Sequence, residues 1–170
     1  KRDVGGRLRD GEAFDRLVEE HYDDVLAYCR RHAPSLDDAP DVAQETFLRF
    51  VRSGRSPIEG KPLAYLLTIA RNLCIDASRA KRPPAVPLDV DVPDRSPGAD
   101  PAAACAGSEV GGLIGALDPE LREVVELRFD QGFKVGEIAQ VLGVSRFAVN
   151  RRLNRALAEL RRGLEGRSGA

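Results

Sequence analysis

Hydrophobic residues recur at steps of three and four positions along much of the chain, which is the spacing of an amphipathic helix. The first such stretch covers residues 12–32 and ends before Pro34, because proline cannot continue a helix. A second predicted helix follows a group of aspartates, whose charge suits a helix N-terminus, and ends at about residue 51. A third covers residues 62–82, with Pro62 in its first turn and Pro83-Pro84 beyond its end.

The composition changes after the third predicted helix. Residues 83–111 contain six prolines, several aspartates and many small residues. Little in this stretch could offset the entropy cost of ordering a packed core. We therefore predict a linker here, with at most a short helix near its end.

Three further helices are predicted beyond the linker. Asp118 is a favourable N-cap residue, Pro119 suits the first helical position, and Gly132 breaks that helix. A short helix covers residues 135–142, and a long final helix covers residues 145–164. No stretch shows the strict alternation of a β-strand.

These elements predict an all-α protein of two small helical domains. Aromatic residues make up only 5% of the chain and Trp is absent, so the cores must be aliphatic, which favours helices. The predicted first domain is a helical bundle over residues 10–82, and the second is a helix-turn-helix domain over residues 113–165. A flexible acidic linker, residues 83–112, would join them.

The segment from Val135 to Val149 has the pattern of a helix-turn-helix. Small Ala139 suits the close crossing of two helices, and Gly143 suits a left-handed turn. Val144 would fill the space between the helices, and Ser145 would begin the second helix. This geometry presents the second helix to the major groove of DNA.

The final helix has two different faces when projected at about 100° per residue. The predicted buried face consists of Val149, Leu153, Ala156, Leu157 and Leu160. The opposite side and the start of the helix carry Arg146, Asn150, Arg151, Asn154, Arg155 and Arg162. Guanidinium and amide groups suit phosphates and the edges of guanine and adenine, so we predict DNA contact. The alternative is an arginine-rich solvated surface on an ordinary helical hairpin.

Charge is distributed in blocks, although the net charge is only −1. Residues 10–50 carry 11 acidic and 4 basic residues, whereas residues 61–82 carry 5 basic and 1 acidic. Residues 83–114 carry 5 acidic and 1 basic, and residues 142–170 carry 7 basic and 2 acidic. Two basic blocks separated by an acidic one indicate two contacts with polyanions on one chain.

Two helices of the first domain carry polar faces. Asn72 in the third helix could hydrogen-bond an unstacked base, with nearby cations holding the strand's phosphates. The second helix combines acid, amide and aromatic groups between Asp41 and Phe50, which indicates a polar interaction face. For each helix, the alternative is a solvated surface without a partner.

Motifs for catalysis, metals and membranes are absent from the sequence. Cys29, Cys74 and Cys105 are too few for a disulfide framework, and Cys29-x-x-His32 has no second ligand pair. His21 and His32 are most simply surface groups. No nucleophile elbow, P-loop or run of about 18 apolar residues occurs. We expect no enzyme activity, cofactor, metal, small-molecule substrate or membrane segment, and a cytoplasmic, nucleoid-associated location.

Taken together, these segments resemble the extracytoplasmic-function sigma factors of bacterial RNA polymerase. Residues 41–48 resemble sigma region 2.2, which in that family grips the clamp coiled coil of the β′ subunit. Residues 65–76 resemble regions 2.3 and 2.4, which open and read the −10 promoter element. Residues 121–160 resemble region 4, whose helix-turn-helix reads the −35 element.

The resemblance implies three sets of contact residues and a role in transcription initiation. The −10 contacts would be Tyr65, Arg71, Asn72, Asp76 and Arg79, with Asn72 holding a flipped base. The −35 contacts would be Ser145, Arg146, Phe147, Asn150, Arg151, Asn154 and Arg155. The contacts to core polymerase would be Asp41, Gln44, Glu45, Phe47 and Leu48.

The implied partners are core RNA polymerase, through its β′ clamp and β flap, promoter DNA, and an anti-sigma factor. The chain departs from the family where Tyr65 replaces the usual Trp and Phe147-Ala148 replace the usual Gly-Thr. A different function remains open from the residues alone. A stand-alone helix-turn-helix regulator would use residues 135–162 on DNA and the N-terminal helices for dimerisation or ligand sensing.

Overall fold

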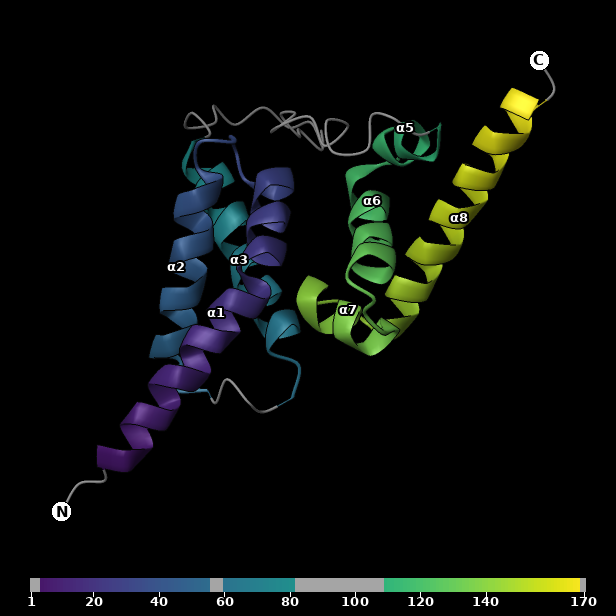
Figure 1. Cartoon of the computed structure of the whole chain (residues 1–170). Helices are drawn as coiled ribbons and strands as arrows, with labels where there is room; N and C mark the ends of the chain where they lie inside the picture. The colour runs from purple at the N-terminus through teal and green to yellow at the C-terminus, as the bar shows by residue number, and fades with distance from the viewer. Residues whose placement is uncertain (1–3, 56–59, 82–108, 169–170) are drawn as a thin grey trace. The chain divides into compact units, whose positions relative to one another are not determined.

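The computed structural model describes residues 4–55, 60–81 and 109–168, and all regular elements within them are helices. The prediction of an all-α fold is confirmed. The chain divides into two compact units, residues 1–99 and 100–170 (Figure 1). The predicted linker lies outside the described residues, except that its last residues, 109–112, form the start of a helix.

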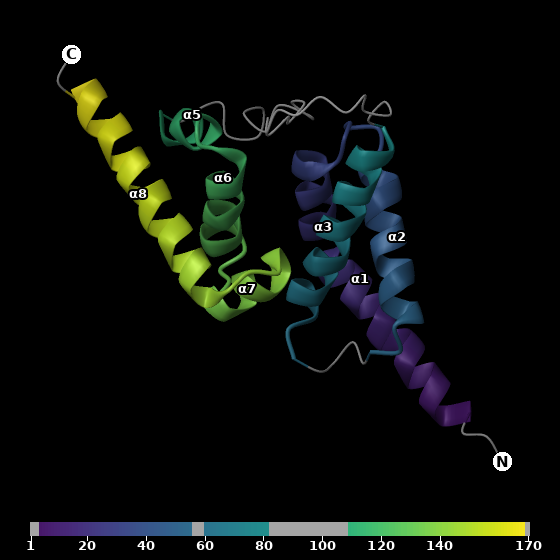
Figure 2. The same cartoon turned by 180° about the vertical axis from the view of Figure 1, so that it is seen from behind.

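The first unit is a bundle of three helices, each packed against the other two (Figure 2). They are α1 (Val4–His32), α2 (Ala39–Arg52) and α3 (Pro62–Ala80). The core is largely aliphatic, as the composition predicted, and the thiols of Cys29 and Cys74 are buried in it. Its other fully buried side chains include Val25, Tyr28, Thr46, Leu66 and Leu67.

Prolines lie at or near helix ends in this unit. Helix α1 ends at His32, two residues before Pro34, as predicted. It begins at Val4 instead of residue 12, so the predicted start was too late. Helix α3 has Pro62 in its first turn, also as predicted, and ends with Lys81 as its C-cap.

The second unit consists of α5 (Glu109–Gly115), α6 (Pro119–Val125), the π-turn η1 (Glu126–Asp130), α7 (Val135–Leu142) and α8 (Arg146–Ser168). Helix α8 packs against α5, α6 and α7. A small apolar core joins α6 to α8, with Ile114 and Leu160 packed at its edge. The buried members of this core are Leu117, Leu121, Val125 and Ala156.

The connection between α7 and α8 has the predicted chemistry of a helix-turn-helix. Gly143 ends α7 with φ of +66°, a left-handed conformation that glycine adopts without steric cost. The hydroxyl of Ser145 accepts a hydrogen bond from the Ala148 N–H at 3.1 Å, which caps α8. Val149 is fully buried beneath this turn.

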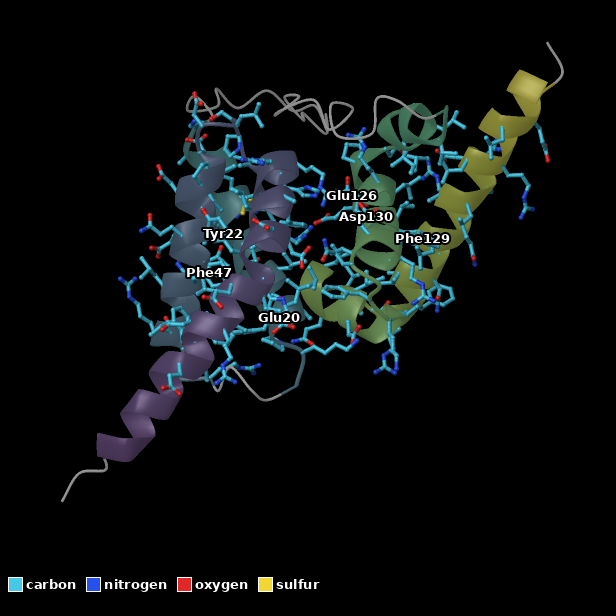
Figure 3. The ribbon with its side chains drawn as sticks, in the orientation of Figure 1. Glu20, Tyr22, Phe47, Glu126, Phe129 and Asp130 are labelled. Carbon is cyan, nitrogen blue, oxygen red and sulfur yellow. The ribbon has the colours of Figure 1, made fainter. Side chains whose placement is uncertain are left out.

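Three features of the second unit differ from the sequence predictions. Asp118 stands at the N-cap of α6, but its side chain makes no capping hydrogen bond. Leu157 is 43% exposed, so its assignment to the buried face of α8 was wrong. The helix through α6 continues as a π-turn, with the Gln131 N–H bonded to the Glu126 carbonyl at 3.2 Å. Phe129 in this turn is 60% exposed (Figure 3).

Candidate functional site

A groove of about 370 Å³ runs along α1 and α2 of the first unit. Four of the five predicted polymerase contacts line it, namely Asp41, Gln44, Phe47 and Leu48. The remaining lining residues, which sequence reasoning did not assign to a site, are Phe14, Val18, Tyr22, Pro40 and Val51. Phe14 and Val18 belong to the apolar pattern of α1, but that pattern does not distinguish a groove wall from a core.

The groove has an apolar floor and a polar rim. Phe47 is 5% exposed and stacks on Tyr22 with ring centroids 6.1 Å apart (Figure 3). Leu48 and Val51 are exposed beside it, and Asp41 and Gln44 add a carboxylate and an amide. An apolar groove with one carboxylate at its rim suits a partner helix that carries apolar side chains and a basic residue.

Glu45, the fifth predicted contact, does not line the groove. Its Oε1 accepts a hydrogen bond from Arg49 Nε at 3.0 Å and lies 3.6 Å from Arg52 Nη1. Both arginines are on the same helix, so these pairs are exposed local ion pairs of small energetic value.

Helix α3 brings three of the predicted −10 contacts onto one exposed face. Asn72, Asp76 and Arg79 are exposed and are spaced so that they lie on one side of the helix. Arg71 is half-buried and lies beside this row. The face therefore offers an amide, a carboxylate and guanidinium groups, which can hydrogen-bond bases and hold phosphates.

Tyr65, the remaining predicted −10 contact, is half-buried between aromatic and cationic neighbours. The Phe50 ring meets it edge-on, with centroids 5.7 Å apart. The Arg55 guanidinium carbon lies 4.3 Å from the centroid of the Tyr65 ring, a cation–π distance. Arg55 was not identified from sequence, because its only signal is an arginine in a polar connection.

Helix α8 and the residue before it expose all seven predicted −35 contacts: Ser145, Arg146, Phe147, Asn150, Arg151, Asn154 and Arg155. The opposite face holds Val149, Leu153 and Ala156, which are buried against α6 and α7. Phe147 is 75% exposed, so it contributes nothing to the core and is available to a ligand. The helix therefore presents an exposed face of arginines and asparagines that also carries the ring of Phe147.

Other parts of the second unit contact several arginines of α8. A Cβ atom on Gly136 would come within 3.2 Å of Arg146 Nη2, so the missing side chain makes room for this guanidinium. Arg152 Nη2 lies 2.9 Å from Glu120 Oε2 of α6. The Arg155 side chain forms two ion pairs, with Asp118 at 3.3 Å and with Glu159 at 3.0 Å.

A polar cluster fixes the end of α3 to the connection between α1 and α2. Lys81 Nζ lies 2.5 Å from Asp38 Oδ2, which also accepts a hydrogen bond from the Ser35 hydroxyl at 2.6 Å. The Lys81 hydrogen bond is the largest cause, and Ser35 the second, of a lowered pKa at Asp38. The cluster therefore lies at the C-terminal end of α3.

Two family models match the chain, one in each unit. The model described as Sigma-70 region 2 matches residues 17–83, and the model described as Sigma-70, region 4 matches residues 113–162. The ECF RNA polymerase sigma factor SigM of Mycobacterium tuberculosis is 31% identical over 157 residues, which cover 90% of this chain and 78% of SigM. The chain belongs to the extracytoplasmic-function RNA polymerase sigma factors.

Other sigma factors support the assignment. The ECF RNA polymerase sigma factor BldN of Streptomyces coelicolor is 32% identical over 160 residues, covering 90% of this chain. The present chain spans only 61% of the length of BldN. The solved structure of CnrH in complex with the cytosolic domain of CnrY has a TM-score of 0.62 and 27% identity, covering 94% of this chain and 97% of CnrH.

The two matched regions of this sigma factor contain every predicted contact residue. The predicted polymerase and −10 contacts lie within residues 17–83, and the predicted −35 contacts lie within residues 113–162. A match to both regions on one chain favours a sigma factor over a stand-alone helix-turn-helix regulator.

The described part of this sigma factor contains no cluster of His, Cys, Asp and Glu suited to a metal ion. Among the same residues, no helix combines the length and the apolar character needed to cross a bilayer.

Proposed function

We propose that this sigma factor binds core RNA polymerase and directs it to promoters, where it recognises the −10 and −35 elements and promotes strand opening. The observation that carries the proposal is the exposed polar face of α8, from Ser145 to Arg155, over buried Val149 and Leu153. A face of arginines and asparagines on a helix-turn-helix is suited to base edges and phosphates. The chain positions the polymerase and carries out no covalent chemistry of its own.

The groove on α1 and α2 is the proposed site for the β′ clamp. Its apolar floor at Phe47 and Leu48 can bury side chains of a helix, and Asp41 can pair with a basic residue. The groove and the polar row on α3 come from different helices, so polymerase and DNA can be bound together.

The second unit also exposes individual large apolar side chains to solvent. Phe129 is 60% exposed and Leu157 is 43% exposed, although such side chains are usually buried. We assign these exposed side chains to the contact with the β flap, the second polymerase contact implied by the family.

We also propose an inhibitory partner, an anti-sigma factor, that covers the groove on α1 and α2. The related CnrH was solved with a protein bound to it, the cytosolic domain of CnrY. A protein seated in this groove would prevent the polymerase from using the same Phe47 and Leu48 surface. Both partners would act in the cytoplasm, where polymerase and DNA are found.

The proposed function can be tested by transcription in vitro on fragmented genomic DNA. Core polymerase with and without the chain would be supplied with nucleotides, and the 5′ ends of transcripts would be sequenced. We expect a set of start sites that depends on the chain and shares two upstream elements. Identical transcripts with and without the chain would contradict the proposal.

A further inference from the structure

Arg155 differs from the other arginines of α8 because two carboxylates from different elements hold its guanidinium. Its Nε donates to Glu159 Oε1 at 3.0 Å, one turn further along α8. Its Nη2 donates to Asp118 Oδ2 at 3.3 Å, across to the start of α6. Arg155 itself remains 63% exposed, so its outer edge faces solvent.

The Asp118 side chain contacts Arg155 and does not cap its own helix, α6. It occupies the N-cap of α6, where an aspartate side chain usually accepts a hydrogen bond from the first turn. No such bond forms, and the carboxylate reaches a residue 37 positions away instead. The Asp118 carboxylate therefore binds Arg155 and does not cap α6.

The two ion pairs of Arg155 affect its binding to phosphates and to base edges differently. An unpaired arginine attracts any backbone phosphate, whatever the DNA sequence. Arg155, Asp118 and Glu159 together carry a formal charge of −1, so the paired guanidinium attracts phosphates less strongly than an unpaired arginine would. The Nη1 hydrogens and the second hydrogen of Nη2 are not used by the two ion pairs and can still donate hydrogen bonds. Two parallel donors of this kind fit the O6 and N7 acceptors of guanine.

We propose that Asp118 and Glu159 are positioning residues that restrict Arg155 to base edges and so set sequence discrimination at the −35 element. The proposal rests on the proposed function and adds a determinant of its specificity. Each ion pair is exposed and weak by itself, but the two carboxylates together favour one orientation of the guanidinium before DNA arrives, which reduces the entropy cost of a directed contact. They also oppose capture of the same side chain by phosphates of unrelated sequences.

The test uses holoenzyme assembled from core polymerase and the full chain. Holoenzyme is first used to select duplexes from a pool with a randomised −35 region upstream of a fixed −10 region. The affinity for the best selected duplex is then compared with the affinity for its scrambled version. The variants are Asp118→Asn, Glu159→Gln, Arg155→Ala, and each carboxylate variant combined with Arg155→Ala.

We expect Asp118→Asn and Glu159→Gln each to lower the ratio of selected to scrambled affinity by about 3- to 10-fold, the loss from a weakened directed contact. Binding to the scrambled duplex should become tighter. In the Arg155→Ala background, neither change should alter the ratio. The matched control is Glu165→Gln, which removes a negative charge from an exposed position of the same helix. It should leave the ratio unchanged.

Circular dichroism of each variant shows whether the helices remain, which separates a positioning role from a loss of fold. An unchanged ratio in both folded carboxylate variants would overturn the proposal. A ratio that falls equally with and without Arg155 would overturn it as well. If the original holoenzyme selects no sequence at all, the proposed function itself fails, and this inference fails with it.

Discussion

Gly143 shows how one backbone conformation supports the DNA-binding helix. Its φ of +66° turns the chain between α7 and α8, and a side chain at this φ is sterically strained. Gly143→Ala should lower the free energy of unfolding by about 1 kcal/mol, measured by urea denaturation followed by circular dichroism. Gly166→Ala is the control, because an added Cβ there meets nothing within 4 Å. If both substitutions destabilised the chain equally, the strain at Gly143 would not be the cause.

Asp38 is the group for which the structure predicts a pH effect. Its pKa lies below the ordinary value of 3.8, mainly because it accepts a hydrogen bond from Lys81. The unfolded chain therefore binds this proton more tightly than the folded chain does. The stability contributed by the pair is present above the ordinary pKa and is lost as the pH falls through the lowered pKa of the folded state.

Lys81→Met should return the pKa of Asp38 toward its ordinary value, because the substitution removes the main cause of the shift. NMR titration of the Asp38 carboxyl group measures this directly. Lys61→Met, at the other end of α3, is the control and should leave the titration unchanged. An unaltered Asp38 pKa in Lys81→Met would show that the ion pair does not form in solution.

Local sequence predicted the roles of some side chains and missed others. Gly143 and Ser145 were predictable because turn and cap chemistry depends on neighbours within a few positions. Asp118 was expected to cap α6, but Arg155, 37 positions away, binds its carboxylate instead. Helical projection placed Leu157 in the core, yet it is 43% exposed, because it lies at the edge of the projected apolar stripe, about 80° from Val149.

The proposed binding of core polymerase in the groove on α1 and α2 can be tested at an exposed residue of α2. Leu48 lines the groove and is 44% exposed, so its removal should not disturb the core of the bundle. Leu48→Ala should weaken binding to core polymerase by about 10-fold, the usual cost of removing a well-buried interface side chain. Biolayer interferometry with immobilised core measures the affinity.

Leu36→Ala provides the matched control for Leu48→Ala. Leu36 is 59% exposed, lies in the connection between α1 and α2, and does not line the groove. Its substitution should leave the affinity unchanged. Equal losses in the two variants would place the polymerase contact elsewhere.

Helix α8 should contain arginines with two different roles. Arg151 is exposed, and no ion pair of its side chain is found in the described residues. Arg151→Ala in the holoenzyme should weaken binding to selected and scrambled duplexes alike and reduce the salt dependence by about one counterion. Arg161→Ala, an exposed arginine further along α8, is the control. A loss confined to the selected duplex would instead identify Arg151 as a base reader.

Helix boundaries were predictable where proline or glycine sets them, and not elsewhere. Pro34, Pro62 and Gly143 mark ends that the structure confirms. The π-turn over Glu126–Asp130 was missed, because apolar spacing does not distinguish the i→i+5 hydrogen bond of a π-helix from the i→i+4 bond of an α-helix. The groove on α1 and α2 was only partly predictable, since its α1 wall has the same apolar spacing as a core face.

The proposed polymerase and DNA contacts are distributed over both units of the chain. The first unit carries the groove and the polar row on α3, and the second unit carries the helix-turn-helix. Blocks of opposite charge along the sequence are consistent with this division, because each unit contains one of the two basic blocks. Promoter recognition should therefore depend on core polymerase holding both units on one DNA.

The most direct test measures promoter binding by the chain alone, core polymerase alone and the two together. A fluorescent duplex that carries one chain-dependent promoter from the transcription experiment would be titrated, with fluorescence anisotropy as the readout. We predict tight, sequence-dependent binding only when both proteins are present. Tight and specific binding by the isolated chain, unaffected by core polymerase, would contradict the proposed division of roles.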